Sequence, residues 1–218
     1  MSSTTLDRLS GLALAIGAAV ALVGHLFGGV IPGQRYFGLP WRAAQFAMLV
    51  GGELILLGLP AVYRRQSSRL GVFGLIAFVL LFGGLIREVA APVNHLWTAA
   101  VAARPEARGL SQQTGVFVVV ILIASQYTVG VIAFGVSVIR ARVFSRAAGG
   151  LLIAGLVVEN LSGVAYRSGL VRPVFEGRLS PDGAVIVFAA LGWLGLELAS
   201  VTGRYCDDGR SASHDDNV

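Results

Sequence analysis

The chain has 218 residues, of which 55% are hydrophobic and only 13% are charged. Soluble domains average about 45–50% apolar and about 25% charged residues, so this composition excludes an ordinary soluble fold and indicates a chain surrounded by lipid. The net charge is +5, but the 17 basic residues, all of them arginine, are scattered over the loops without forming a basic face. We therefore predict the lipid bilayer as a partner and no binding of nucleic acid.

The apolar residues fall in blocks of about 20, the length at which an α-helix crosses about 30 Å of hydrocarbon. We predict six spans, over residues 11–30, 43–63, 70–90, 115–139, 147–166 and 184–202. Lipid offers no partner to free backbone groups, so each block is predicted to be helical. The predicted fold is an all-α polytopic transmembrane helix bundle of about six spans, in one domain over residues 1–203.

Two short connections between these blocks predict the orientation of the bundle. Both are dense in arginine and contain no acid, with Arg64, Arg65 and Arg69 in the second, and Arg140, Arg142 and Arg146 in the fourth. The positive-inside rule places these connections, and with them both termini, on the cytoplasmic side of the inner (plasma) membrane. The last segment, residues 204–218, is polar and is predicted to be a disordered cytoplasmic tail.

Glycine is the main packing signal, because small residues let helices approach closely in lipid. On the fifth span Gly155, Glu159 and Gly163 are spaced four residues apart and therefore share one helix face. We expect Glu159 to point at a neighbouring helix rather than at lipid.

Three glutamates lie within the predicted hydrocarbon region, namely Glu53, Glu159 and Glu197. An acid at a helix centre costs about 2.5–3.5 kcal/mol to insert, so such a residue usually faces the bundle or a wet cavity and has a partner. The polar side chains available as partners, and as candidate substrate-binding residues, are Arg87, Glu88, Gln126, Asn160 and His25. Their predicted depths suggest a buried polar pocket that opens outward.

Two interpretations of these residues remain open. In the functional one, burial keeps Glu53 or Glu159 protonated as a catalytic proton donor, while Arg87 holds a second carboxylate ionised. Glu197 is a third candidate catalytic residue. In the other, the polar side chains only hydrogen-bond across helices, which contributes about 0.6–2 kcal/mol per bond and fixes the helix register. The spacings of zinc and di-iron sites, of phosphate-binding loops and of nucleophile elbows do not occur, so we predict no metal and no cofactor.

The run PWRAAQFAMLVGGELILLGLPAVYRRQSSRLGVFGLIAFVLLFGG resembles a set of small, uncharacterised multi-span membrane proteins of actinobacteria. The likeness lies in the GLPAVYRRQ turn and the glycine-spaced span after it, and it implies topology and source but no chemistry. In size, and in carrying an acid on an early span and on the last, the chain is also similar to integral-membrane terpene cyclases. That similarity implies Glu53 and Glu197 as the acids, although Glu53 lies in GGEL without the tryptophan-rich surround of those enzymes.

Three function classes follow from these observations. The chain is a structural or accessory membrane protein, an intramembrane enzyme that uses a protonated glutamic acid on an isoprenoid or lipid substrate, or a small proton-coupled transporter. The first class is the simplest, because helix packing alone explains the buried polar residues without a chemical role. An apolar small molecule or lipid is the substrate that the second class implies, and the sequence does not define the oligomeric state.

Overall fold

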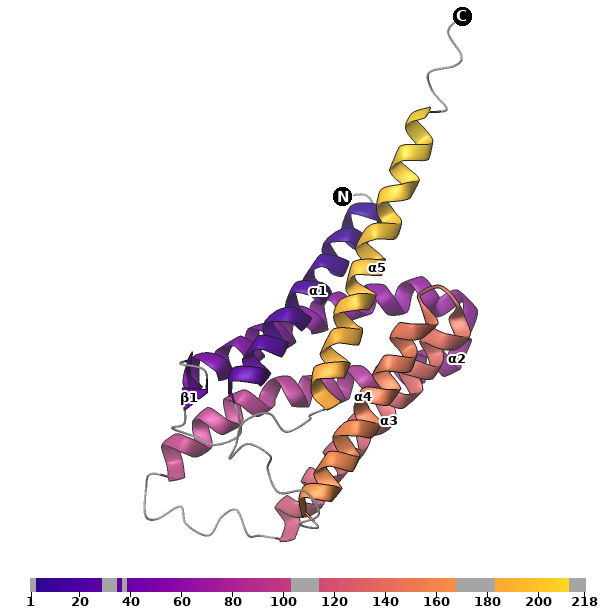
Figure 1. Cartoon of the computed structure of the whole chain (residues 1–218). Helices are drawn as coiled ribbons and strands as arrows, with labels where there is room; N and C mark the ends of the chain where they lie inside the picture. The colour runs from indigo at the N-terminus through magenta and orange to yellow at the C-terminus, as the bar shows by residue number, and fades with distance from the viewer. Residues whose placement is uncertain (1–2, 29–34, 37–38, 103–113, 168–182, 212–218) are drawn as a thin grey trace, which may run out of the picture.

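A computed structural model describes residues 3–28, 35–36, 39–102, 114–167 and 183–211 of the chain (Figure 1). Within them lie five helices, α1 (Ser3–Gly28), α2 (Trp41–Ala102), α3 (Thr114–Ala141), α4 (Arg146–Arg167) and α5 (Gly183–Ser211). Two short strands, β1 (Arg35–Tyr36) and β2 (Leu39–Pro40), pair antiparallel between α1 and α2. Apart from this small hairpin the described chain is all-α, as the composition predicts.

Three helices in the described part of the chain are long and apolar enough to cross a membrane. The membrane-length segments are Thr4–Leu26 in α1, Trp41–Ala90 in α2 and Gly183–Ser200 in α5. The segment in α2 is 50 residues long, which is more than one crossing requires. Helix α5 continues to Ser211, into the segment that the sequence predicts to be disordered, and residues 212–218 lie outside the described part.

The long helix α2 turns back on itself at Gly71 (Figure 1). The φ of 54° and ψ of −140° at this residue belong to a region that glycine enters at no steric cost, so the chain reverses there without a loop. The sequence predicts the reversal earlier, over residues 64–69, because the prediction rests on the arginines. The backbone conformation that reverses the chain occurs at the glycine that follows them. We call residues 41–70 and 72–102 the first and second limbs of α2.

The second limb also extends beyond its predicted end at residue 90. It continues to Ala102, so residues 91–102, which follow the third predicted span, are helical. Pro92 lies inside this helix. Proline removes one backbone hydrogen bond but does not have to end a helix, and for that reason it misleads the prediction of a boundary.

The helices form a closed circuit of neighbours. Helix α1 packs on the first limb of α2 and on α5, α5 packs on α4, α4 on α3, and α3 on α2. Tyr63 and Phe78 join the two limbs of α2 by stacking their rings at 4.7 Å between centroids. The circuit brings the first and last helices of the chain side by side (Figure 1).

Reciprocal glycine pairs lie at four contacts of this circuit. The pairs are Gly17–Gly51 between α1 and α2, Gly11–Gly195 between α1 and α5, Gly135–Gly149 between α3 and α4, and Gly155–Gly183 between α4 and α5. A Cβ on Gly17 would lie 2.7 Å from the Gly51 carbonyl oxygen, and a Cβ on Gly51 would lie 2.7 Å from that of Gly17. The backbones touch, which is the close packing that small residues allow between helices in lipid.

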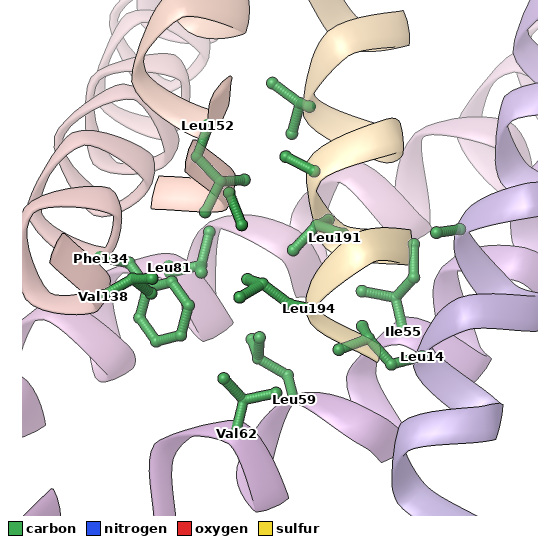
Figure 2. Packing of buried hydrophobic residues seen from close by; sticks show 14 of the residues in the cluster. Leu14, Ile55, Leu59, Val62, Leu81, Phe134, Val138, Leu152, Leu191 and Leu194 are labelled. Carbon is green, nitrogen blue, oxygen red and sulfur yellow. The ribbon is translucent and has the colours of Figure 1, made fainter. Parts of the chain in front are cut away.

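A continuous apolar core fills the centre of the circuit (Figure 2). All five helices contribute to it, with Leu14 from α1, Ile55, Leu59 and Leu81 from α2, Phe134 from α3, Leu152 from α4, and Leu191 and Leu194 from α5. Among the described residues the buried polar side chains are Gln45, Gln66 and Ser137, and no charged side chain is fully buried.

Both arginine-rich turns lie at one end of the bundle, which we call the arginine end. Arg69 near the end of the first limb of α2 donates from Nη1 to the Ala141 carbonyl oxygen at the end of α3, at 3.0 Å. Asp7 near the start of α1 forms ion pairs with Arg64 and Arg65. The N-terminal end of α1 and both turns therefore lie at the same end of the bundle.

Candidate functional site

Glu197 of α5 has the best-defined surroundings of the three glutamates. Its Oε1 accepts a hydrogen bond of 2.7 Å from the indole Nε1 of Trp193, one turn earlier in the helix. Its Oε2 accepts one of 2.8 Å from the backbone N–H of Ser145. Both carboxylate oxygens are thus engaged by the protein itself.

The contact with Ser145 fixes the turn between α3 and α4. The Ser145 hydroxyl oxygen accepts a bond of 3.2 Å from the backbone N–H of Ala147, as an N-cap residue does at the start of a helix. Arg142 in the same turn has a φ of 52°, which is uncommon for a residue with a side chain. Glu197 holds this irregular segment against α5, which is a structural task.

Glu159 lies against the beginning of α5. A Cβ on Gly183 would lie 2.7 Å from the Glu159 Cβ, so the two helices meet at this residue. The half-buried Glu159 therefore faces a neighbouring helix, as its spacing with Gly155 predicts. The adjacent Asn160 instead donates from Nδ2 to the Leu156 carbonyl oxygen of its own helix, at 2.9 Å.

Two further pairs of predicted residues meet farther along the helices, away from the arginine end. Arg87 of the second limb of α2 donates from Nη1 to Oε1 of Gln126 on α3. Glu88 interacts electrostatically with His25 of α1. The His25 ring lies 6.0 Å from that of Phe188 on α5, measured between centroids. These contacts tie helices together in pairs.

Glu53 stands apart from the other predicted residues. Its side chain is exposed near the middle of the first limb of α2. Within the part of the chain that the structure describes, no hydrogen bond or ion pair reaches it. Phe46, Val50 and Leu57 are exposed on the same limb, at spacings that put them on one face with Glu53. We call these four residues the Glu53 face.

An apolar groove of about 900 Å³ runs between α1 and α5 on the outside of the bundle. Small residues hollow its floor, namely Ala15, Ala18, Ala19, Ala189 and Gly192. Larger side chains wall it, including Leu12, Ile16 and Leu196, and Trp193, Glu197 and Ser200 border it. A smaller groove of about 380 Å³ lies between the second limb of α2 and α3, from Phe73 to Arg140.

Sequence reasoning missed several residues that the structure uses. Gln66, which looks like a loop residue in RRQSSR, is fully buried and donates from Nε2 to the Ser137 hydroxyl at 3.3 Å. The partnership of Glu197 with Trp193 could have been found, because tryptophan four residues before glutamate lies on the same helix face. Nothing in the sequence points to Ser145, which lies 52 residues away from Glu197.

The structure gives no sign of a metal centre in the part that it describes, since no three His, Cys, Asp or Glu side chains there form a group that could hold an ion. The predicted candidates thus lie at separate places, with Glu197 at the α3–α4 turn, Glu159 at the start of α5, and Glu53 on an outer face. Comparison with protein families, with curated proteins and with solved structures found no match to the chain.

Proposed function

We propose that the chain is a six-pass membrane bundle that serves as an accessory or structural subunit, and that the Glu53 face binds a transmembrane helix of its partner protein. The two limbs of α2 supply two passes, because each is long enough to cross about 30 Å of hydrocarbon. Helices α3 and α4 have 28 and 22 residues, or about 42 Å and 33 Å at the usual helical rise. With α1 and α5 this makes six passes.

The exposed carboxyl of Glu53 is the observation that carries the partner assignment. Several other candidate residues contact the protein itself, as Glu197 does through both of its oxygens and Arg87 does through Gln126. Glu53 lies at mid-limb among exposed apolar side chains, where lipid tails offer no hydrogen bond. An acid at that depth costs about 2.5–3.5 kcal/mol to insert and usually faces protein. A partner helix with a hydrogen-bond donor at the same depth would satisfy it.

The partner would also cover apolar surface. Leu57 is 68% exposed, Phe46 is 56% exposed and Val50 is 49% exposed. Helices in lipid associate through van der Waals packing and interhelical hydrogen bonds, and the Glu53 face offers both. An accessory role needs no further chemistry from the chain.

Site-specific photocrosslinking in the membranes of the native cell tests this proposal. A photoreactive amino acid at position 57 is expected to capture one defined protein, identified by mass spectrometry. Capture should persist in Glu53→Gln, whose amide still forms hydrogen bonds, and should be lost in Glu53→Leu. The matched control is the same probe at Leu161 of α4, which is 63% exposed and should contact lipid alone.

Two results would overturn the proposal. A crosslink from position 57 to a second copy of this chain would show self-association in place of an accessory role. A crosslinking pattern that is identical in Glu53→Leu and in the parent chain would show that the carboxyl recognises nothing.

A second candidate function is an intramembrane enzyme that acts on an isoprenoid or lipid, and the position of Glu197 beside the groove between α1 and α5 favours it. In that case a folded Glu197→Gln variant would lose the conversion of fed isoprenoid or lipid extracts. If product formation is unchanged, or if no product forms with the parent chain, this candidate is excluded.

A further inference from the structure

The groove between α1 and α5 has the dimensions of one lipid tail in one leaflet. Its lining on α1 extends from Leu12 to Leu22, which is about 15 Å along the helix axis. The hydrocarbon of a bilayer is about 30 Å thick, so a groove of this length matches one leaflet. Its small floor residues and larger walls form a channel along the helices rather than a flat surface.

The groove lies in the leaflet on the side of the arginine end. Gly11 of α1 packs on Gly195 and Ala199 of α5, which sets the level at which the lining begins. Asp7, one turn before Gly11, pairs with Arg64 and Arg65 of the arginine end. The lining therefore starts next to that end and extends from it toward the membrane centre.

Arg8 stands at the mouth of the groove. It lies four residues before Leu12, which puts it on the groove-lining face of α1, about 6 Å beyond that residue. Its side chain is exposed, and no described residue forms an ion pair or hydrogen bond with it. Asp7, the nearest acid in the sequence, is already paired with the arginines of α2. The guanidinium is thus available to an anion at the membrane surface.

We propose that this groove binds one anionic phospholipid of that leaflet, with an acyl chain along Leu12–Leu22 and the lipid phosphate at Arg8. The apolar lining excludes water and accepts the chain, while a guanidinium binds phosphate through paired N–H donors. The other arginines at this end add a positive field that attracts anionic headgroups. A zwitterionic lipid fills the same groove but gains less from that field.

Fluorescence quenching of Trp193, which borders the groove, provides the test. Trp41→Phe and Trp97→Phe leave Trp193 as the single tryptophan, since the chain has three. The protein is placed in bilayers that contain a minor fraction of phosphatidylglycerol or phosphatidylcholine with brominated acyl chains. We expect phosphatidylglycerol to bind about fivefold better, the factor that one arginine contributes near a charged surface.

Matched variants separate a specific site from general attraction. Arg8→Gln should remove most of the preference and Arg8→Lys should keep most of it. Arg142→Gln, which removes a charge from the α3–α4 turn at the same end and so weakens only the general field, should reduce the preference much less than Arg8→Gln does. Gly192→Leu, where a Cβ has room at 3.5 Å from Ala18, should reduce quenching by filling the groove.

Three results would overturn the proposal. Equal quenching by the two lipids, or equal effects of Arg8→Gln and Arg142→Gln, would show that no site exists at Arg8. Weak quenching by both lipids, together with disulfide crosslinking between copies of an Ala19→Cys variant, would show that a second chain fills the groove. Circular dichroism of each variant establishes that its helices have formed.

Discussion

Arg69 donates a hydrogen bond to the carbonyl oxygen of Ala141, across 72 residues of sequence. The bond satisfies one of the backbone carbonyls that are left free at the end of α3, and it draws the two arginine-rich turns together. The charge pattern predicts that the turns share a side of the membrane, and this contact shows that they share one end of the protein.

Accessibility labelling should find both turns on the same side of the membrane. In a Cys206→Ser background, the exposed positions of Ser68→Cys and Arg142→Cys should react with an impermeant maleimide in inverted vesicles and stay unreactive in right-side-out vesicles. Cys206 of the parent chain should behave in the same way if the C-terminus is cytoplasmic. Reaction of the two turns from opposite sides would contradict the arrangement.

The neighbouring glycines of α4 should respond differently to alanine. A Cβ on Gly149 would lie 2.7 Å from the Gly135 carbonyl oxygen, whereas a Cβ on Gly150 would meet nothing within 4 Å. We expect Gly149→Ala to lower the free energy of unfolding by about 1–3 kcal/mol through overpacking. Gly150→Ala should be neutral or stabilising by up to about 1 kcal/mol. Unfolding by SDS titration in mixed micelles measures both, and equal effects would contradict the close contact.

Gly71→Ala should destabilise the protein although space is available for the added methyl group. No atom lies within 4 Å of the Cβ position, so the cost comes from the backbone conformation alone. Such strain costs about 1–3 kcal/mol in the free energy of unfolding. Val72→Ala, at a 73% exposed position next to it, is the control and should have a small effect. A neutral Gly71→Ala variant would show that the chain reverses in another way.

The hydrogen bonds of Glu197 can be tested by a double-mutant cycle with Trp193. In Glu197→Gln one carboxylate oxygen becomes an amide donor that faces an N–H, which should cost about 1–3 kcal/mol of stability. Trp193→Phe removes the indole donor, so the amide in the double variant can accept from Ser145 without opposing a second donor. The double variant should therefore be more stable than the sum of the single effects predicts. Additive effects would show that the two side chains do not interact.

The sequence predicts the all-α fold and the membrane-length helices because lipid leaves the chain few alternatives. Spacing also locates Glu159 against a neighbouring helix, since Gly155 one turn earlier marks the contact face. The predicted position of the reversal in α2, residues 64–69, was too early. Arginines indicate where the chain reaches the membrane surface, whereas the reversal itself needs the backbone freedom of Gly71.

The sequence predicts that the polar residues share one pocket, but this depends on which helices are neighbours, and helical periodicity does not reveal that. Periodicity shows that Glu53 shares a face with Val50 and Leu57, but it does not show which helices cover that face. In the structure this face of α2 is exposed. Likewise Glu197 binds the backbone N–H of Ser145 in the α3–α4 turn, and a backbone group carries no sequence signal.

The contact between Gly11 and Gly195 has a consequence for the synthesis of the protein. Helix α1 is synthesised before α5, so the surface of α1 that packs on α5 stays uncovered until α5 has been made. The backbone N–H of Ser145 in the α3–α4 turn also has no Glu197 carboxylate to bind until Glu197 has been synthesised. Nascent chains that stop before α5 therefore leave the α5-facing surfaces of α1 and α4 exposed, and the packing of these five helices is complete only after α5 has been synthesised.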